Sequence, residues 1–207
     1  MLDIKQIDFD KMNGLVPVIV QDNHTLQVLM LGFMNEEALH QTLSSGLVTF
    51  FSRTKNRLWQ KGETSGDFLR VVEMFQDCDN DTILIMANPM GNTCHTGAFS
   101  CFTSQKTPAL SQIGALDKTI INRINYPQEG SYTNKLIAKG IKKIAQKVGE
   151  EGVEVVIAAL NETTDEYLGE MTDLLYHALV LLHAKNLDLD HFAAKIEQRH
   201  KEKINEV

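Results

Sequence analysis

The sequence predicts an α+β protein, with a β-rich N-terminal domain followed by an all-α helical bundle. Two observations support this fold class. Short runs of β-branched and aromatic residues, separated by turn-forming stretches such as residues 21–24, fill the first hundred positions. From about Ala109 onward, apolar residues recur at helical spacing and the strand signals disappear. We therefore expect two domains, residues 1–106 and 109–207, joined near residues 103–108.

The first half is predicted to contain one helix among its strands. Strands are expected at residues 17–20, 28–33, 48–51, 69–74 and 82–86. Between the second and third of these, Asn35 is a suitable N-cap, and Glu36 and Glu37 favour a first helical turn. Gly46 fits the position just past the C-terminus. The helix should therefore begin after Asn35 and end before Gly46.

The second half is predicted to be helical throughout. One helix should cover residues 110–124 and end before residues 125–127. Helical spacing continues through three further sets of apolar residues: Ile137, Ile141, Ile144 and Val148; Leu168, Met171, Leu175, Ala178 and Leu182; Phe192 and Ile196. Several helices joined by short loops are typical of a bundle.

The composition narrows the class of protein. Among 207 residues, 43% are hydrophobic and 23% charged, which is ordinary for a globular protein. A net charge of −7 argues against nucleic acid as the main partner, and an acidic enzyme acting on phosphorylated substrates would need bound cations. No apolar run is long enough to cross a bilayer, and the N-terminal residues lack the layout of a signal peptide. We expect a cytoplasmic protein without a membrane partner.

Three cysteines, Cys78, Cys94 and Cys101, lie close together in the first half. Without a secretory signal, such a group favours metal binding or catalysis over disulfides. Three thiolates could hold Zn²⁺ and leave a fourth position open, as in catalytic zinc sites. The alternative is three small buried side chains, and spacing alone does not decide between them. His95 could transfer a proton, support a ligand or lie at the surface.

Two more polar segments surround the cysteines in the sequence. Asp77, Asp79 and Asp81 occupy alternate positions, so an extended chain would direct them to one side, where they could bind a hard cation. A solvated acidic turn is the alternative. Residues 59–66 combine glycines, hydroxyls and a lysine, which suits a loop around a phosphate or ribose. Trp59, the only tryptophan, is expected in the core or at the rim of such a site.

Acidic residues dominate one predicted helix of the second half. Glu150, Glu151 and Glu154 share a helical face, and Glu170 and Asp173 form another pair three residues apart. Like charges at these spacings destabilise a helix, which indicates Mg²⁺ ions that hold a polyphosphate and activate water. A solvated acidic surface is the alternative. Flanking glycines at 149 and 152 indicate a place where close approach matters more than helix stability.

The basic and histidine residues of the second half are less informative. Lys147 is the candidate contact to a substrate phosphate, because it lies beside the glutamates. The histidines show no ligand spacing to one another and are interpreted as structural or surface residues: His177, His183, His191 and His200.

These segments together resemble a known pair of domains. The first half resembles phosphoribosyl-AMP cyclohydrolase at residues 14–20, 34–39, 52–53, 58–66, 77–81, 94–97 and 100–102. The second half resembles phosphoribosyl-ATP pyrophosphohydrolase, a relative of the MazG-type all-α nucleotide pyrophosphatases, at residues 132–133, 135–136, 147–151, 154, 170 and 173–177. The chain, from about residue 10 to 201, is thus similar to the fused bifunctional enzymes of histidine biosynthesis.

The resemblance implies which residues carry each step. Phosphoribosyl-ATP would lose pyrophosphate in the helical domain, and the purine ring of phosphoribosyl-AMP would be opened at C6 by a zinc-activated water in the first domain. The implied catalytic residues are His95, Glu150, Glu151 and Glu154. The implied metal ligands are Cys78, Cys94 and Cys101 for Zn²⁺, and Asp77, Asp79, Asp81, Glu151, Glu154, Glu170 and Asp173 for Mg²⁺. The implied substrate contacts are Ser52, Arg53, Trp59, Lys61, Gly62, Thr64, Ser65, Lys135 and Lys147.

The resemblance also implies a homodimer in which both subunits contribute zinc ligands, and a helical domain that dimerises. Two other interpretations stay open from the residues. The chain could be a single-activity pyrophosphatase with a zinc-bound regulatory module, or a metal-stabilised structural protein without turnover. Against both, each half keeps its own set of candidate ligands.

Overall fold

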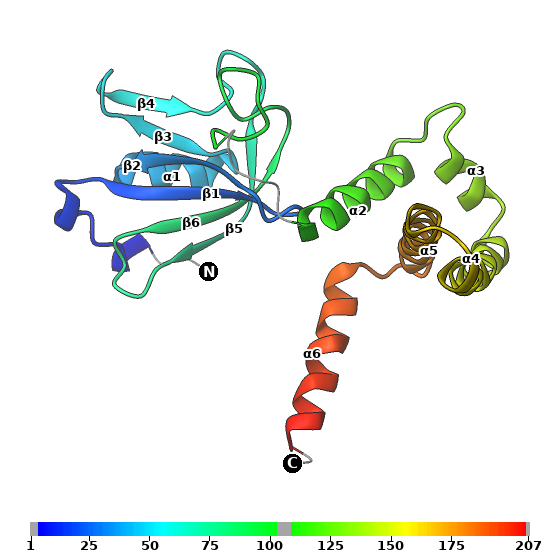
Figure 1. Ribbon diagram of the computed structural model, residues 1–207. Helices are drawn as coiled ribbons and strands as arrows, with labels where there is room; N and C mark the ends of the chain where they lie inside the picture. Colours follow the sequence, from blue (N-terminus) through cyan, green and yellow to red (C-terminus); the bar gives the residue numbers. More distant parts are fainter. Residues whose placement is uncertain (1–3, 103–108, 206–207) are drawn as a thin grey trace. The chain divides into compact units, whose positions relative to one another are not determined.

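A computed structural model describes residues 4–102 and 109–205 (Figure 1). The chain forms two compact units, Met1–Ala115 and Leu116–Val207, with the boundary inside helix α2 (Ala109–Asn125). All described strands belong to the first unit, and every described element from α2 onward is helical. The predicted α+β class is therefore confirmed. The expected linker at residues 103–108 lies outside the described residues.

The first unit is built on a four-stranded sheet of order β2-β1-β6-β5. Its strands are β1 (Val16–Asp22), β2 (Val28–Met34), β5 (Leu69–Gln76) and β6 (Ile83–Pro89). β1 runs parallel to β6, and the β1–β2 and β5–β6 pairs are antiparallel. Two short 3-10 helices, η1 (Ile4–Gln6) and η2 (Asp10–Met12), precede the sheet. These four strands confirm the predicted ones, with ends shifted by a few residues.

A second, two-stranded sheet pairs β3 (Thr49–Ser52) with β4 (Arg57–Gln60). Sequence patterning predicted β3 but missed β4, because Arg57–Gln60 is short and begins and ends with polar residues; its strand depends on pairing with β3. The two sheets pack closely at Gly32, where an added Cβ would lie 2.3 Å from the ring of Phe50. Phe50 is 1% exposed and belongs to the core.

The single helix of the first unit, α1 (Glu36–Ser45), has the predicted ends. The side chain of Asn35 accepts a hydrogen bond from the backbone amide of Ala38, which satisfies a free amide of the first turn. Gly46 ends the helix with φ 69°, a conformation that favours glycine. Ala38 and Leu39 are fully buried and attach α1 to the core.

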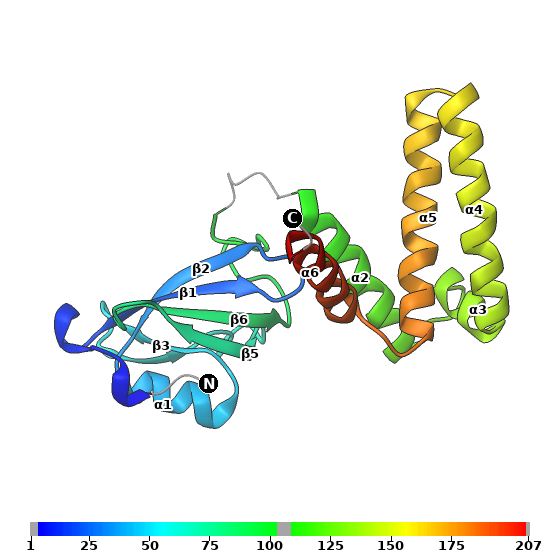
Figure 2. The same cartoon turned by 90° about the horizontal axis from the view of Figure 1, so that it is seen from below.

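The second unit contains the rest of α2, then α3 (Tyr132–Ala138), α4 (Ile141–Asn161), α5 (Thr164–Ala184) and α6 (Leu189–Asn205). Figure 2 shows α4 and α5 side by side along their length. A small core joins α2, α3, α4 and α5: Ile120, Leu136, Ile144, Leu179 and Val180. The predicted helical character of this half is confirmed.

One detail of the helical prediction is wrong. The apolar spacing from Ile137 to Val148 does not mark one helix, because Gly140, at φ 81°, separates α3 from α4. On α5 the predicted helix is confirmed, and its apolar stripe is only partly in the core. Leu175 packs against the core, whereas Leu168 and Met171 are 55% and 39% exposed.

Within residues 4–102 and 109–205, no helix combines the length and the hydropathy that a bilayer crossing requires.

Candidate active sites

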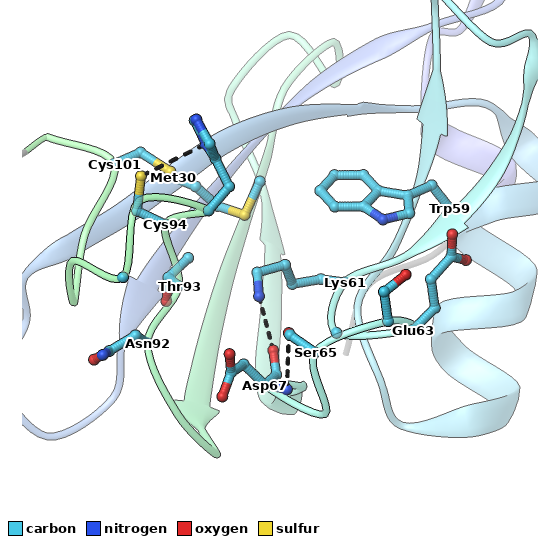
Figure 3. A pocket seen from close by; sticks show the side chains of 14 residues that line it. Met30, Trp59, Lys61, Glu63, Ser65, Asp67, Asn92, Thr93, Cys94 and Cys101 are labelled. Carbon is cyan, nitrogen blue, oxygen red and sulfur yellow. Dashed lines mark hydrogen bonds between the residues drawn. The ribbon is translucent and has the colours of Figure 1, made fainter.

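The first unit contains a cavity of about 450 Å³ beside the loop after β6 (Figure 3). Residues predicted from separate segments line it: Trp59, Lys61, Gly62, Thr64, Ser65, Cys94, His95 and Cys101. Thr93, in the same wall, was not anticipated; its hydroxyl is buried and has no hydrogen-bond partner among the described residues. An unsatisfied buried hydroxyl in a cavity wall is a group that a polar ligand would satisfy.

Cys94 and Cys101 face each other in this cavity, and their thiols differ in acidity. The hydroxyl of Thr96 donates to Sγ of Cys94 at 3.2 Å, and this hydrogen bond lowers the pKa of Cys94. Desolvation by partial burial, together with the neighbouring Cys94, raises the pKa of Cys101. His95 lies next to the pair, with Nδ1 3.8 Å from Sγ of Cys94. Two adjacent thiols and an imidazole form a donor set that suits a soft or borderline cation such as Zn²⁺.

Cys78 does not lie in this cavity. It follows β5 in an exposed turn, with Sγ 4.0 Å from Oδ1 of Asp79. The structure of one chain therefore brings together Cys94 and Cys101 and leaves the third candidate zinc ligand apart from them.

The three aspartates beside Cys78 do converge. One carboxylate oxygen of each of Asp77, Asp79 and Asp81 lies within 4.8 Å of the others. The reason differs from the predicted one, because the segment is a turn and not an extended chain. Oδ1 of Asp77 accepts the backbone amides of Asp81 and Thr82 at 3.0 Å, and this folds the segment back on itself.

Lys61 lines the cavity, but its ammonium is hydrogen-bonded to the backbone of the 61–67 loop. It is 6% exposed, and its ammonium donates to the carbonyl oxygen of Asp67 at 2.8 Å. Burial lowers the pKa of Lys61. The loop closes tightly at Gly62, with φ 93°, where an added Cβ would lie 2.6 Å from the backbone of Asp67. Lys61 and Gly62 thus hold the 61–67 loop in place around the cavity.

A second cavity, of about 280 Å³, shares Trp59, Glu63 and Thr64 with the first. Ser52 lines it as well, together with Lys55 and Arg57, which sequence reasoning missed. Trp59 stacks on Phe50 with ring centroids 5.7 Å apart, so it is both core and rim. Arg53 lines neither cavity; its guanidinium lies 3.7 Å from the ring centroid of Phe33.

The helical unit brings together three of its predicted ligands, Glu151, Glu154 and Glu170, each with an oxygen within 4.8 Å of the others. Glu151 is 4% exposed, so this cluster is partly buried. Asp173 is not part of the cluster. Glu150 is directed elsewhere, toward Lys147 at 3.0 Å and the amide of Gln146 at 2.6 Å.

The closeness of these carboxylates shifts their pKa values. A hydrogen bond to Glu151, followed by burial and the charges of Glu151 and Glu170, raises the pKa of Glu154. Burial would also raise the pKa of Glu151, but hydrogen bonds with Lys147, whose Nζ lies 2.7 Å from Oε1, and with Glu154, together with the charges of Lys147 and His177, lower it. A divalent cation would relieve this repulsion, so the cluster fits Mg²⁺ chemically.

The remaining predictions for this half have mixed outcomes. Lys147 is paired with Glu150 and Glu151, and Lys135 is exposed on α3. Gly149 and Gly152 do not mark a close approach within this chain, because an added Cβ would meet nothing within 4 Å at either position. His177 was interpreted as structural or surface; it is buried, with Nδ1 3.5 Å from Oε1 of Glu151.

The fold and the two sites define a two-domain protein with paired thiols at a cavity in a β-rich unit and a carboxylate cluster in a helical unit. The family model described as phosphoribosyl-AMP cyclohydrolase matches residues 30–103, and the one described as phosphoribosyl-ATP pyrophosphohydrolase matches residues 113–200. The chain belongs to the family of bifunctional histidine-biosynthesis proteins that join these two hydrolase domains.

Full-length relatives support this assignment, and each is described as the histidine biosynthesis bifunctional protein HisIE. The Bacteroides thetaiotaomicron protein is 53% identical over 195 residues, which cover 94% of this chain and 96% of the relative. The Haemophilus influenzae protein is 51% identical, and the match covers 96% of this chain and 95% of the relative. The Escherichia coli protein is 52% identical, and the match covers 95% of this chain and 96% of the relative.

Proposed function

We propose that residues 109–207 hydrolyse phosphoribosyl-ATP to phosphoribosyl-AMP and pyrophosphate, and that residues 1–106 then hydrolytically open the purine ring of phosphoribosyl-AMP at C6. The single observation that carries this proposal is that each half has its own chemically distinct donor set. The first has the thiol pair Cys94 and Cys101 at a cavity, and the second has the carboxylates Glu151, Glu154 and Glu170.

In the helical domain, the chain would hold Mg²⁺ with Glu151, Glu154 and Glu170, and Asp173 is a further candidate ligand. The crowding that raises the pKa of Glu154 supports this assignment. When bound, Mg²⁺ would neutralise the triphosphate and acidify a water. The part of the protein itself is to hold these carboxylates together, to pair Glu150 and Glu151 with Lys147, and to bring Lys135 and Lys147 within reach of the phosphates.

In the first domain, Zn²⁺ would be held by Cys94, Cys101 and Cys78. When bound, it would bring the pKa of a water close to neutrality. His95 would receive or return a proton, a role that its position in the cavity wall beside Cys94 supports, and the 61–67 loop with Trp59 and Ser52 would enclose the nucleotide. Asp77, Asp79 and Asp81 would bind Mg²⁺ close to the substrate phosphates, a proposal that their convergence supports.

We also propose a homodimer. Cys78 lies apart from the Cys94–Cys101 pair within one chain, so a complete three-cysteine site needs a second copy. The apolar side chains exposed on α4 and α5 support the same assembly: Val153, Val156, Ile157, Leu160, Leu168 and Met171. A face of this kind favours burial against another copy. A cytoplasmic location stays a prediction.

The test follows both steps separately in the full chain. With phosphoribosyl-ATP, Mg²⁺ and Zn²⁺, we expect pyrophosphate release and then the absorbance change of ring opening. Glu154→Gln should stop the first step and leave ring opening of supplied phosphoribosyl-AMP intact, and Cys94→Ser should do the reverse. Glu162→Gln, at the exposed C-terminal end of α4, is the matched control and should affect neither.

Two results would reject the proposal. Pyrophosphate release without ring opening would make the chain a single-activity pyrophosphatase with a zinc-bound module. No turnover in either assay would make it a metal-stabilised structural protein.

A further inference from the structure

His177 of α5 is buried between a tyrosine of α3 and a glutamate of the carboxylate cluster. Its Nε2 lies 3.0 Å from Oη of Tyr132. On the other side of the ring, Nδ1 lies 2.8 Å from the carbonyl oxygen of Asp173 and 3.5 Å from Oε1 of Glu151. His177 and Glu151 are each 4% exposed and so are shielded from water, whereas Tyr132, at the other end of this line of contacts, is 52% exposed.

The partners of the ring determine the direction of its hydrogen bonds. Both groups near Nδ1 are acceptors, a carbonyl oxygen and a carboxylate oxygen, so Nδ1 carries a proton. In the neutral ring, Nε2 then accepts the phenolic proton of Tyr132. The hydroxyl of Tyr132 therefore favours the tautomer in which Nδ1–H donates to the carbonyl oxygen of Asp173, with Nδ1 3.5 Å from Oε1 of Glu151.

Glu151 is thus contacted on two sides at one oxygen, by an ion pair with Lys147 and by the dipole of the His177 ring. Oε1 accepts from Lys147 at 2.7 Å and faces Nδ1 of His177. A carboxylate restrained in this way has few rotamers left, and its position relative to Glu154 and Glu170 is set before a cation arrives. Groups that orient a metal ligand in this manner tune the affinity of the site without touching the metal.

We propose that Tyr132 and His177 are positioning residues of the pyrophosphohydrolase site, which orient Glu151 so that it meets Glu154 and Glu170 at a divalent cation. This inference rests on the proposed function, in which that cluster binds Mg²⁺. It assigns a role to the short helix α3, whose first residue is Tyr132.

A separate contact distinguishes positioning from simple attachment of α3. Thr133 Oγ1 and Tyr176 Oη lie 2.8 Å apart, and this second hydrogen bond also ties α3 to α5. It does not involve the imidazole nitrogens. Tyr176→Phe therefore removes one hydroxyl and one α3–α5 hydrogen bond, as Tyr132→Phe does, but leaves both ring nitrogens of His177 with their partners.

The experiment measures Mn²⁺ binding directly, from the electron paramagnetic resonance signal of the free ion, in the full chain. All proteins compared carry Asp79→Asn and Asp81→Asn, so that the aspartate cluster does not contribute. We expect Tyr132→Phe to weaken Mn²⁺ binding about ten-fold, as loss of a ligand-orienting group commonly does. Tyr176→Phe should bind as the parent does. His177→Asn, whose amide can replace the Nδ1 donor, should retain more affinity than His177→Leu.

Activity gives an independent readout. In Tyr132→Phe, the Mg²⁺ concentration for half-maximal pyrophosphate release should rise by about the same factor, with KM for phosphoribosyl-ATP at saturating Mg²⁺ unchanged. Ring opening of phosphoribosyl-AMP should be unaffected by Tyr132→Phe, which is measured in chains that keep Asp79 and Asp81. Parent-like Mn²⁺ binding in Tyr132→Phe, or equal losses in Tyr132→Phe and Tyr176→Phe, would overturn the inference while leaving the proposed function intact. A parent that neither binds Mn²⁺ nor releases pyrophosphate would overturn both.

Discussion

Lys11 places its ammonium 2.9 Å from Oδ2 of Asp79. The same nitrogen lies 3.2 Å from Oδ2 of Asp81, so a lysine of the N-terminal segment partly neutralises the aspartate cluster. Hydrogen bonds to Asp79 and then to Asp81 raise the pKa of Lys11. A cation that binds these carboxylates must displace the lysine.

Replacing this lysine should strengthen cation binding at the aspartate cluster. We expect Lys11→Met to raise the Mn²⁺ affinity of this cluster a few-fold, since solvent-exposed ion pairs are weak competitors. The measurement is a Mn²⁺ titration of proteins that also carry Glu154→Gln, which removes the helical site. Lys55→Met removes an equal charge from the turn between β3 and β4 and is the control. Unchanged or weaker binding in Lys11→Met would show that the lysine does not compete.

The start of α5 depends on a capping box. The carboxylate of Glu166 accepts the backbone amide of Thr163 at 2.9 Å and its hydroxyl at 2.7 Å, and these bonds lower the pKa of Glu166. Thr163→Ala should destabilise α5 by about 1 kcal/mol. Faster amide exchange in the first turns of α5 would measure the loss, and Thr164→Ala, one residue inside the helix, should leave exchange unchanged.

The same capping box makes a prediction about pH. The pKa of Glu166 is depressed in the folded state, so its contribution is present above the unfolded pKa and is lost as pH falls through the folded value. The difference in α5 exchange protection between the wild type and Glu166→Gln should therefore be full at neutral pH and shrink in acid. A difference that grows in acid would contradict this account.

Two glycines should respond in opposite directions to the same substitution. An added Cβ at Gly149 meets nothing within 4 Å, so Gly149→Ala should stabilise α4 by roughly 0.5–1 kcal/mol. At Gly32 the Cβ would lie 2.3 Å from the ring of Phe50, so Gly32→Ala should destabilise the first unit by about 1–3 kcal/mol. Amide exchange in α4 and β2 reports each change. Destabilisation by Gly149→Ala would indicate that something outside this chain approaches α4 there.

The proposed dimer can be tested on α4. Leu160 is 77% exposed beside other exposed apolar side chains, so Leu160→Glu should convert dimers to monomers at micromolar concentration. Size-exclusion chromatography with light scattering measures the mass. Leu110, 74% exposed at the start of α2, provides the matched control, and Leu110→Glu should remain dimeric. A wild-type protein that is monomeric would reject the dimer itself.

Local signals predicted much of the fold. Asn35 and Gly46 are caps whose effect reaches only the adjacent turn, and the structure has α1 between them. In the second half, the break at Gly140 was missed, because apolar spacing continues across this residue. Its backbone, at φ 81°, is not helical and interrupts the helix. Spacing also could not separate a core stripe from an exposed apolar face, as Leu168 and Met171 illustrate.

Site prediction was complete only where ligands are neighbours along the chain; among groups that meet through tertiary packing, it included Glu170 and missed the contact of His177. Glu151 and Glu154 lie one turn apart on a single helix, so their proximity follows from helical geometry. His177 comes from another helix, and no spacing rule connects it with Glu151. For the same reason, the sequence did not indicate Lys55 and Arg57, which line the second cavity because β3 pairs with β4.

Residue types and short-range periodicity were enough to predict the α+β class, the caps of α1 and the acidic character of both clusters, because each of these is a local property. Which donors meet depends on the folded chain. It brought Cys94 to Cys101 and left Cys78 apart, folded Asp77, Asp79 and Asp81 together through a turn, and placed His177 against Glu151. The turn of the aspartates is local, but the contact of His177 with Glu151 joins two helices and arises from their packing, which no local pattern encodes.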